Sequence, residues 1–213
     1  MPPTSAEDSK RRLLEAAVEV LQTDGITAMS SRTVSQRAGV AQGLVFYHFG
    51  SVADIVAAAC LAATQTRVDR HRERFESASA FVDLVDLARE VQVAEREAGT
   101  VSILGQALVA AQSDEAVAEA SRQALDLWRE PILDATNRLL RAGSPFAGVI
   151  DAETFTELLM AAFVGFELTD PVRPDGLADR SFEALSTVAA VLDGLGPMGR
   201  RALAATLKRQ RSR

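Results

Sequence analysis

The amino-acid sequence predicts an all-α protein in which a small three-helix domain precedes a larger α-helical domain. Apolar residues recur every three or four positions, and no segment shows the apolar–polar alternation typical of a strand. Serines stand before several periodic segments and glycines follow them, as the capping preferences of helices require. With 213 residues, 47% hydrophobic and 24% charged, the chain has an ordinary globular composition and enough length for a small and a larger domain.

The first part of the chain predicts three helices and the start of a fourth. A helix capped by Ser5 or Ser9 should end at Gly25, because a left-handed C-cap costs little only for glycine. A second helix, capped by Ser30 or Ser31, should reach residue 38, and a third should follow Gly39 over residues 41–48. A long fourth helix should begin after Ser51 and run to about residue 75.

Five more helices are expected beyond the fourth. Their ranges are near 80–97, 100–112, 114–142, 152–169 and 179–194. Pro131 lies inside one of these patterns and should kink or split that helix. The remaining segment forms either a basic helix or a frayed tail. We therefore predict a small helical domain at 1–52, a larger helical domain at 53–196 and a basic tail at 197–213.

The charge is distributed unevenly along the chain, whose net charge is −6. Residues 1–52 carry five basic and five acidic groups, whereas residues 53–196 carry twelve basic and twenty-four acidic groups. Residues 197–213 carry six basic groups and no acidic one. Since the acidic middle repels nucleic acid, only the two ends suit contact with DNA.

Other compositional features concern the compartment. A single cysteine excludes an internal disulfide and fits a reducing cytoplasm. The first twelve residues lack the apolar core of a signal peptide, and no run of eighteen uncharged apolar residues exists to span a membrane. We therefore expect a cytoplasmic protein with no membrane segment.

Residues 31–49 have the pattern of a helix-turn-helix motif, in which two short helices flank a glycine-containing turn. Val34 and Ala38 supply an apolar side to the first helix, and Val45 and Phe49 supply one to the second, each pair at spacing i, i+4. The second helix of such a motif enters the major groove of DNA. The residues expected to face outward are Gln42, Gly43, Leu44, Tyr47 and His48.

The segment from Arg11 to Ala58 resembles the tetracycline-repressor (TetR) family of bacterial regulators. The resemblance rests on LLEAAVEVLQTDGI and on the string AGVAQGLVFYHFGS, whose residue order is specific. It implies a dimer whose last two helices pair with those of a second subunit, and a ligand pocket within roughly the fourth to seventh helices. The resemblance also implies a repressor that a small molecule releases from a near-palindromic operator.

Three residues depart from the usual pattern of that family. Ala41 replaces a capping serine or threonine, Phe46 replaces a tyrosine whose hydroxyl can reach a phosphate, and Val52 replaces a lysine. Phe46 and Val52 remove contacts with the DNA backbone. Ala41 removes a helix cap that contributes roughly 1 kcal/mol. We therefore expect weaker affinity for DNA but the same fold.

Two residues are candidates for reading bases. Gln42, in the first turn of the recognition helix, can form a bidentate hydrogen bond with adenine, which we favour over plain exposure to solvent. Arg32 matches a family position that often reads guanine, and contact with a base or a phosphate is equally expected. The full set of expected DNA-binding residues is Ser31, Arg32, Thr33, Gln42, Gly43, Leu44, Phe46, Tyr47 and His48.

The larger domain offers candidates for a ligand pocket and a dimer interface. Pockets are mostly apolar with a few polar groups, and the candidates of that kind are Gln106, Trp128, Asn137 and Phe163. Such a lining, with few cations, favours a hydrophobic or cationic ligand. Two apolar stripes near the end of the chain provide the expected interface, with Phe155, Leu159, Phe182, Leu185, Val188 and Leu192.

An enzyme is the alternative class for the larger domain. The sequence contains no nucleophile elbow, no phosphate-binding glycine loop and no HExxH pair. His48 and His71 have no second ligand at metal-binding spacing, and arginines surround His71. We therefore expect no catalytic residue, no cofactor and no metal. The expected partners are double-stranded operator DNA, an unidentified small molecule and a second copy of the chain.

Overall fold

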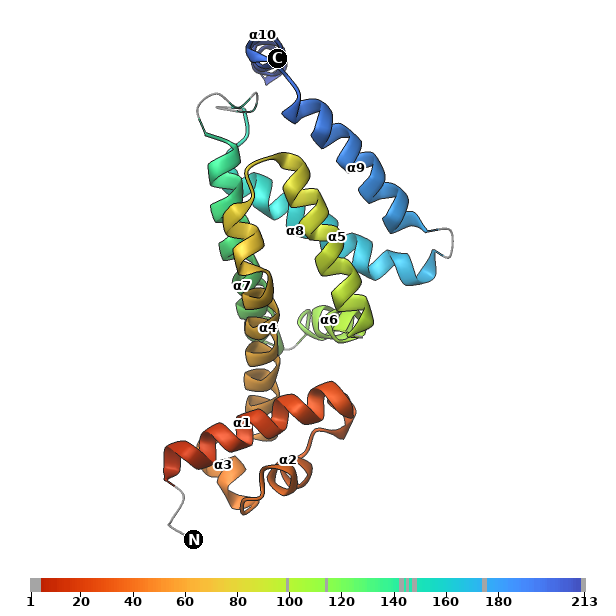
Figure 1. Ribbon diagram of the computed structural model, residues 1–213. Helices are drawn as coiled ribbons and strands as arrows, with labels where there is room; N and C mark the ends of the chain where they lie inside the picture. Colours follow the sequence, from red (N-terminus) through yellow and green to blue (C-terminus); the bar gives the residue numbers. More distant parts are fainter. Residues whose placement is uncertain are drawn as a thin grey trace. The chain divides into compact units, whose positions relative to one another are not determined.

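The computed structural model describes residues 5–98, 100–113, 115–141, 144, 146, 149–173 and 176–211 (Figure 1). Every regular element in this part of the chain is a helix, so the predicted all-α class is confirmed. The α-helices are α1 (Ala6–Thr23), α2 (Ser31–Ala38), α3 (Gly43–Phe49), α4 (Val52–Ser77), α5 (Phe81–Glu97), α6 (Thr100–Ala110), α7 (Glu115–Leu139), α8 (Ala152–Thr169), α9 (Leu177–Asp193) and α10 (Pro197–Arg211). Two short 3₁₀ helices are η1 (Ile26–Ala28) and η2 (Asp170–Val172).

The chain forms two compact units. The first unit contains residues 1–68 and 106–125, and the second contains residues 69–105 and 126–213. Helices α4, α6 and α7 each contribute residues to both units. The division into 1–52, 53–196 and 197–213 stays a prediction.

Hydroxyl side chains cap three helices of the first unit. The backbone N–H of Asp8 donates to Ser5 Oγ at 3.1 Å, and that of Asp54 donates to Ser51 Oγ at 3.1 Å. Ser30 Oγ accepts from the backbone of α2 in the same way, at 3.0 Å. Ser5 and Ser30 are therefore the caps, and not the alternatives Ser9 and Ser31. Gly25, with φ of +81°, directly follows Asp24, the C-cap residue of α1.

The core of the first unit joins α1 to the two short helices that follow it. Leu13, Val20, Val34 and Val45 are fully buried, and α1 packs against both α2 and α3. An isolated helix of seven or eight residues is unstable in water, so this packing is what maintains α2 and α3. The apolar residues at spacing i, i+4 do lie on the inward side, with Phe49 half-buried.

The second unit has its own apolar core. Phe75, Leu87 and Val91 are buried, and further side chains pack against them: Leu84, Trp128, Ile132 and Phe163. Helix α9 packs along α5 (Figure 1), and the carboxylate of Asp193 accepts the backbone N–H groups of Phe81 and Val82, both at 3.0 Å. An aspartate at the end of α9 thus caps the start of α5.

Two features of the second half of the chain differ from, or go beyond, the sequence prediction. Helix α7 continues through the buried Pro131 as one helix, so of the two expected effects, a kink or a split, the split does not occur. Residues 197–211 form the helix α10, which settles the alternative between a basic helix and a frayed tail. Helix α9 is consequently not the last helix of the chain.

We also tested the helices for membrane-spanning character. No single helix of the described residues is long and apolar enough to cross a membrane. The pair α3 and α4, bent by 68°, passes by length and composition alone.

Candidate DNA-binding site

The turn between α2 and α3 is stabilised by an arginine from α1. Arg12 Nη2 donates to the carbonyl of Ala38 at 2.6 Å and to that of Gly39 at 3.4 Å. These carbonyls lie at the C-terminal end of α2, where a cation also interacts favourably with the helix dipole. Gly39 has φ of +63°, and a Cβ atom there would lie 3.0 Å from Arg12 Nη2. Both the backbone conformation and the position of Arg12 therefore require glycine at this turn.

A hydrogen bond between Ser9 and His48 links α1 to α3. The Ser9 hydroxyl donates to the carbonyl of Ala6 at 2.9 Å, so its oxygen accepts the Nε2–H of His48 at 2.7 Å. The neutral imidazole then has only an acceptor left at Nδ1. His48 therefore positions α3, and it has a second N–H for a phosphate only when the ring is protonated.

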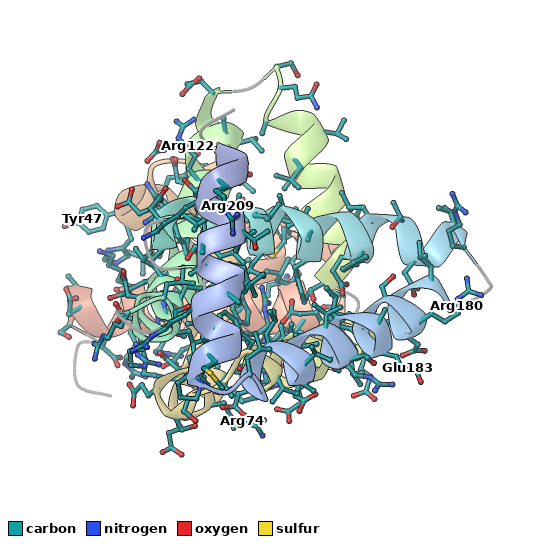
Figure 2. All side chains as sticks on the ribbon, turned by 90° about the horizontal axis from the view of Figure 1, so that it is seen from above. Tyr47, Arg74, Arg122, Arg180, Glu183 and Arg209 are labelled. Carbon is teal, nitrogen blue, oxygen red and sulfur yellow. The ribbon has the colours of Figure 1, made fainter. Side chains whose placement is uncertain are left out.

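The outer side of α3 is exposed and carries aromatic rings. Tyr47 is 74% exposed and projects away from the ribbon (Figure 2), and Phe46 is also exposed. Leu44 is half-buried, whereas Gly43 is exposed and a Cβ atom there would meet no atom within 4 Å. Since the protein itself leaves room for a side chain at Gly43, the absence of one favours close approach of another molecule.

Gln42 lies at the start of α3 and is held by α2. Its Nε2 donates to Ser31 Oγ at 2.8 Å, while Ser31 is buried. Gln42 is exposed, and its second Nε2–H and its carbonyl oxygen are the two groups that a bidentate contact with adenine uses. Ser31 therefore orients the amide of Gln42 rather than presenting its own hydroxyl to DNA.

Most cations of the N-terminal region are engaged within the protein. Arg37 pairs with Glu19 at 2.8 Å and with Asp24 at 2.9 Å, whereas the exposed Arg32 and Lys10 form no ion pair within the described residues. These two are the cations of residues 5–52 that remain available for phosphates. Thr33, another expected contact, shares a hydrogen bond of 2.8 Å with Ser30 and is half-buried.

A hollow of about 410 Å³ lies beside this surface. It is lined by Ala6, Ser9, Gly39, Val40, Ala41, Leu44, Tyr47 and His48. None of the lining residues is acidic, and the hydroxyls and the imidazole are polar groups suited to an anion. The hollow thus adds a surface without negative charge to the exposed side of α3.

Three of the four predicted pocket residues have described side chains, and two of these three lie on one cluster. Trp128 and Phe163 pack against the same core cluster of the second unit. Asn137 is exposed, and the side chain of Gln106 lies outside the described residues. Trp128 stacks edge-on against Phe75, with ring centroids 6.5 Å apart. The structure thus supports an aromatic cluster but does not bring Asn137 to it.

Two buried polar side chains of the second unit were missed by sequence reasoning. Glu167 is 3% exposed, and Gln92 is 2% exposed. Glu167 Oε1 and Gln92 Nε2 have no hydrogen-bond partner among the described residues. Burial raises the pKa of Glu167 to about 7, while Arg96 lowers it and Glu95 and Asp170 raise it. The sequence signal that could have indicated their burial is that each residue lies in an apolar stripe of its helix.

The predicted interface residues divide into three groups by their exposure to solvent. Phe182 is buried against Phe166, with ring centroids 5.7 Å apart, and therefore belongs to the core of its own unit. Leu185 and Val188 on α9 are exposed, and so are two residues that the sequence did not single out, Leu158 and Val191. Phe155, Leu159 and Leu192 are half-buried.

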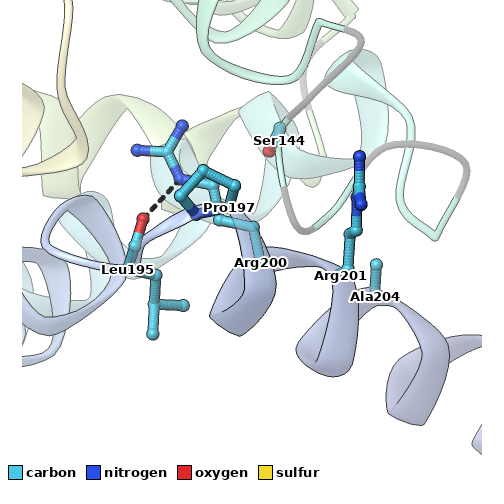
Figure 3. Close-up of a pocket in the computed structure, with 6 residues that line it drawn as sticks. All are labelled: Ser144, Leu195, Pro197, Arg200, Arg201 and Ala204. Carbon is cyan, nitrogen blue, oxygen red and sulfur yellow. Dashed lines mark hydrogen bonds between the residues drawn. The ribbon is translucent and has the colours of Figure 1, made fainter.

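A further hollow of about 450 Å³ lies at the start of α10 (Figure 3). Its lining is Ser144, Leu195, Pro197, Arg200, Arg201 and Ala204. Arg200 Nε donates to the carbonyl of Leu195 at 2.8 Å, which ties the side chain to the chain segment before α10. Basic residues of the tail are thus partly used within the protein.

Comparison with known proteins agrees with this geometry. Residues 13–59 match the family model described as bacterial regulatory proteins, tetR family. An uncharacterised HTH-type transcriptional regulator of Mycobacterium tuberculosis is 25% identical over 171 residues, which cover 79% of this chain and 85% of that protein. An uncharacterised HTH-type transcriptional regulator of Mycobacterium bovis is likewise 25% identical over 171 residues.

Solved structures show the same fold. A Rhodococcus sp. protein described as a TetR-family transcriptional regulator has a TM-score of 0.66 and 20% identity, covering 87% of this chain and all of that one. The multidrug binding protein EbrR, complexed with proflavin, has a TM-score of 0.61 and 23% identity, covering 86% of this chain and 99% of that one.

The helix-turn-helix with its exposed second helix defines a DNA-binding protein of the transcriptional-regulator class. The matched segment begins in α1 and ends in α4, so it contains the whole motif. Over residues 13–59 the chain therefore matches the TetR family of bacterial transcriptional regulators.

Proposed function

We propose that this protein is a homodimeric repressor that binds a near-palindromic operator and is released from it by a small molecule. The observation that carries the proposal is the exposed side of α3, where Gln42, Phe46 and Tyr47 stand on a buried scaffold. Gln42 reads bases in this proposal, and Arg32, Tyr47 and Lys10 contact phosphates. Ser31 and His48 position the recognition helix.

The exposed apolar residues of α8 and α9 support dimerisation. Leu185, Val188 and Val191 recur at spacings of three along α9, so they lie on one side of that helix. Leu158 adds an exposed apolar group on α8, which contacts α9. Apolar groups gathered on neighbouring helices mark a protein interface. We therefore assign the interface to this surface, named here the α8–α9 surface.

The small molecule is assigned to the second unit. The aromatic residues Trp128 and Phe163 meet there, and the polar groups of Gln92 and Glu167 are buried there without partners. This combination of apolar lining and a few polar groups is typical of a ligand site. EbrR, which has the same fold, was solved with proflavin, and a hydrophobic or cationic ligand is proposed here as well.

Footprinting tests the proposal directly. A two-fold dimer should protect two symmetric half-sites whose centres lie about one duplex turn, roughly 34 Å, apart. Genomic fragments, including the region upstream of the protein's own gene, provide the DNA. Protection of a single unpaired site, or the absence of any mobility shift at low salt, would contradict the proposal. A molecule that releases the DNA should be recovered unchanged, whereas its turnover would favour an enzyme.

Gln42→Ala and Arg32→Ala should separate base reading from phosphate contact. Loss of the Gln42 amide should cost roughly 1–3 kcal/mol on the operator and little on random DNA. Loss of one phosphate contact at Arg32 should instead weaken both DNAs and flatten the slope of log K against log salt by about 0.9. Fluorescence anisotropy over a salt series measures both quantities.

Arg122→Ala is the matched control for this pair. Arg122 is exposed and its ion pairs with Glu115 and Glu119 lie on the protein surface, where such pairs contribute little to stability. Its removal should leave the salt slope and the affinity unchanged. An unchanged operator affinity in Gln42→Ala would show that α3 does not read bases through its first turn.

A further inference from the structure

Ser9, in the first turn of α1, is a buried hydroxyl in contact with the recognition helix. It is 3% exposed, whereas its neighbours in the sequence, Asp8 and Lys10, are not buried. Alanine would fill a small buried position of a helix with a better helix propensity than serine. The hydroxyl of Ser9 is therefore explained by what it binds, the imidazole of His48 on α3.

The two distances around Ser9 Oγ determine where its proton lies. The oxygen is 2.9 Å from the carbonyl oxygen of Ala6 and 2.7 Å from His48 Nε2. Two oxygens form such a contact only with a proton between them, and the carbonyl has none, so Ser9 donates to Ala6. The proton of the second hydrogen bond must then come from Nε2. Ser9 thus selects the Nε2–H tautomer of the neutral His48 ring, in which Nδ1 is an acceptor without a proton.

His48 is held at the edge of a hollow that carries no negative charge. The ring is half-buried and contributes to the lining of the hollow of about 410 Å³ beside α3. The ring of Tyr47 packs edge-on against it, with centroids 4.8 Å apart. Tyr47 is the other titratable residue of that lining. An imidazolium at this position would therefore find no carboxylate in the hollow.

The charged side chains on the elements around α3 have partners other than His48. The pairs are Asp8 and Glu15 with Arg11 on α1, Arg12 with the carbonyl of Ala38, Arg37 with Glu19 and Asp24, and Asp54 with Ser51 at the start of α4. Glu7, Lys10 and Arg32 are exposed and form no ion pair within the described residues. A positive charge on His48 would consequently be neutralised best by an anion from outside the protein.

A phosphate of DNA presents only acceptor oxygens, and this decides which form of His48 can bind it. In the neutral ring Nδ1 is itself an acceptor, so it repels a phosphate oxygen. Protonation at Nδ1 adds a donor and a positive charge, and it leaves the bond from Nε2–H to Ser9 intact. A histidine gains this proton between about pH 8 and pH 5, and a neighbouring anion favours the gain.

We propose that Ser9 is a positioning residue that makes operator binding depend on protonation of His48. One proton from the solvent binds to Nδ1 when a backbone phosphate docks there, the Nδ1–H then donates to the phosphate oxygen, and no covalent bond of the DNA changes. The inference rests on the proposed function, because the phosphate belongs to the operator. Without the Ser9 hydroxyl, the neutral ring can carry its proton on Nδ1 and donate to the phosphate with no proton uptake.

Fluorescence anisotropy with an operator fragment at fixed salt, from pH 8 to pH 6, measures the linkage in the full-length protein. Wild-type affinity should rise as the pH falls, approaching about tenfold per pH unit for one proton. Ser9→Ala and His48→Gln should reduce the change to less than about twofold per unit, and Ser9→Thr should restore it. Ser35→Ala is the matched control, because Ser35 is also buried and donates to a carbonyl three residues earlier, at 3.1 Å, without touching His48. It should leave the pH dependence unchanged.

The tautomer can be measured without DNA. The chain has two histidines, so comparison with His48→Gln assigns the ring nitrogens of His48 in a long-range proton–nitrogen NMR spectrum. At pH 8 the wild type should carry the proton on Nε2, and Ser9→Ala should show a mixture of both tautomers.

An Nδ1–H tautomer in the wild type, or a pH dependence that survives in Ser9→Ala, would overturn the proposal. Equal operator affinity of the wild type at pH 6 and pH 8 would also overturn it and would leave the repressor function standing. The absence of operator binding at both pH values would instead contradict the proposed function, and the proton linkage with it.

Discussion

Replacing Leu185 and Val188 together with aspartate should convert the protein to a monomer and abolish operator binding. Leu185 is 43% and Val188 57% exposed, so the change removes little packing within the chain. In the associated state, however, four buried unpaired carboxylates across the two copies would face an apolar surface, which is strongly unfavourable. Light scattering coupled to size-exclusion chromatography measures the mass, and a mobility shift measures DNA binding.

The loss of DNA binding should be large because two linked half-site contacts become one. Linked binding exceeds single binding by roughly 10²–10⁴-fold, and a monomer forfeits that gain. Val109→Asp adds a charge at another exposed apolar residue, on α6, and should change neither mass nor affinity. A doubly substituted protein that remains dimeric would show that the α8–α9 surface is not the interface.

Glu167→Gln should stabilise the folded protein, and the gain should depend on pH. The pKa of this carboxyl rises from its usual 4.5 to about 7 on folding, chiefly through burial. The folded state therefore binds more protons than the unfolded state between these values, and stability falls as the pH rises through that window. At 1.36 kcal/mol per pKa unit the penalty above pH 7 amounts to roughly 3 kcal/mol, which the neutral amide avoids.

Urea unfolding followed by circular dichroism measures this effect at pH 8 and at pH 4.5. The variant should be more stable than the wild type at pH 8, and the difference should shrink toward pH 4.5, where both side chains are neutral. Glu153→Gln, at an exposed position, should shift stability by less than about 0.5 kcal/mol at either pH. Equal stability of wild type and Glu167→Gln at pH 8 would mean that Glu167 is not an unneutralised buried charge.

The helices could be predicted where a cap and a periodic apolar pattern agree. The range 152–169 coincides with α8 because Asp151 caps its first turn through a hydrogen bond of 2.8 Å, a local interaction between residues three apart. A split at Pro131 was one of two predicted effects because the proline was judged locally, and it does not occur. The proline is buried, and tertiary packing continues the helix on both sides of it.

The DNA-binding motif could be predicted because its caps and apolar pattern are local in the sequence. The interactions that position it could not be predicted. Arg12 contacts a carbonyl 26 residues away, and Ser9 contacts His48 across 39 residues. Neither pairing has a signature in sequence spacing. Glu167 was overlooked because a single acidic residue in an apolar stripe reads as an exposed one until burial is known. Only the three-dimensional packing shows that its charge lacks a partner.

The contact of Asp193 with the start of α5 has a consequence for how assembly and ligand binding communicate. The aspartate ends the helix that carries Leu185 and Val188, while α5 carries Gln92 toward its other end. Self-association that orders α9 therefore also restrains α5, because both N–H bonds depend on the placement of Asp193. A thermodynamic linkage of this kind acts equally in both directions. In the proposed dimer, self-association through α9 and ligand binding beside α5 are then coupled through one side chain, and the subunit concentration affects the sensitivity to the ligand.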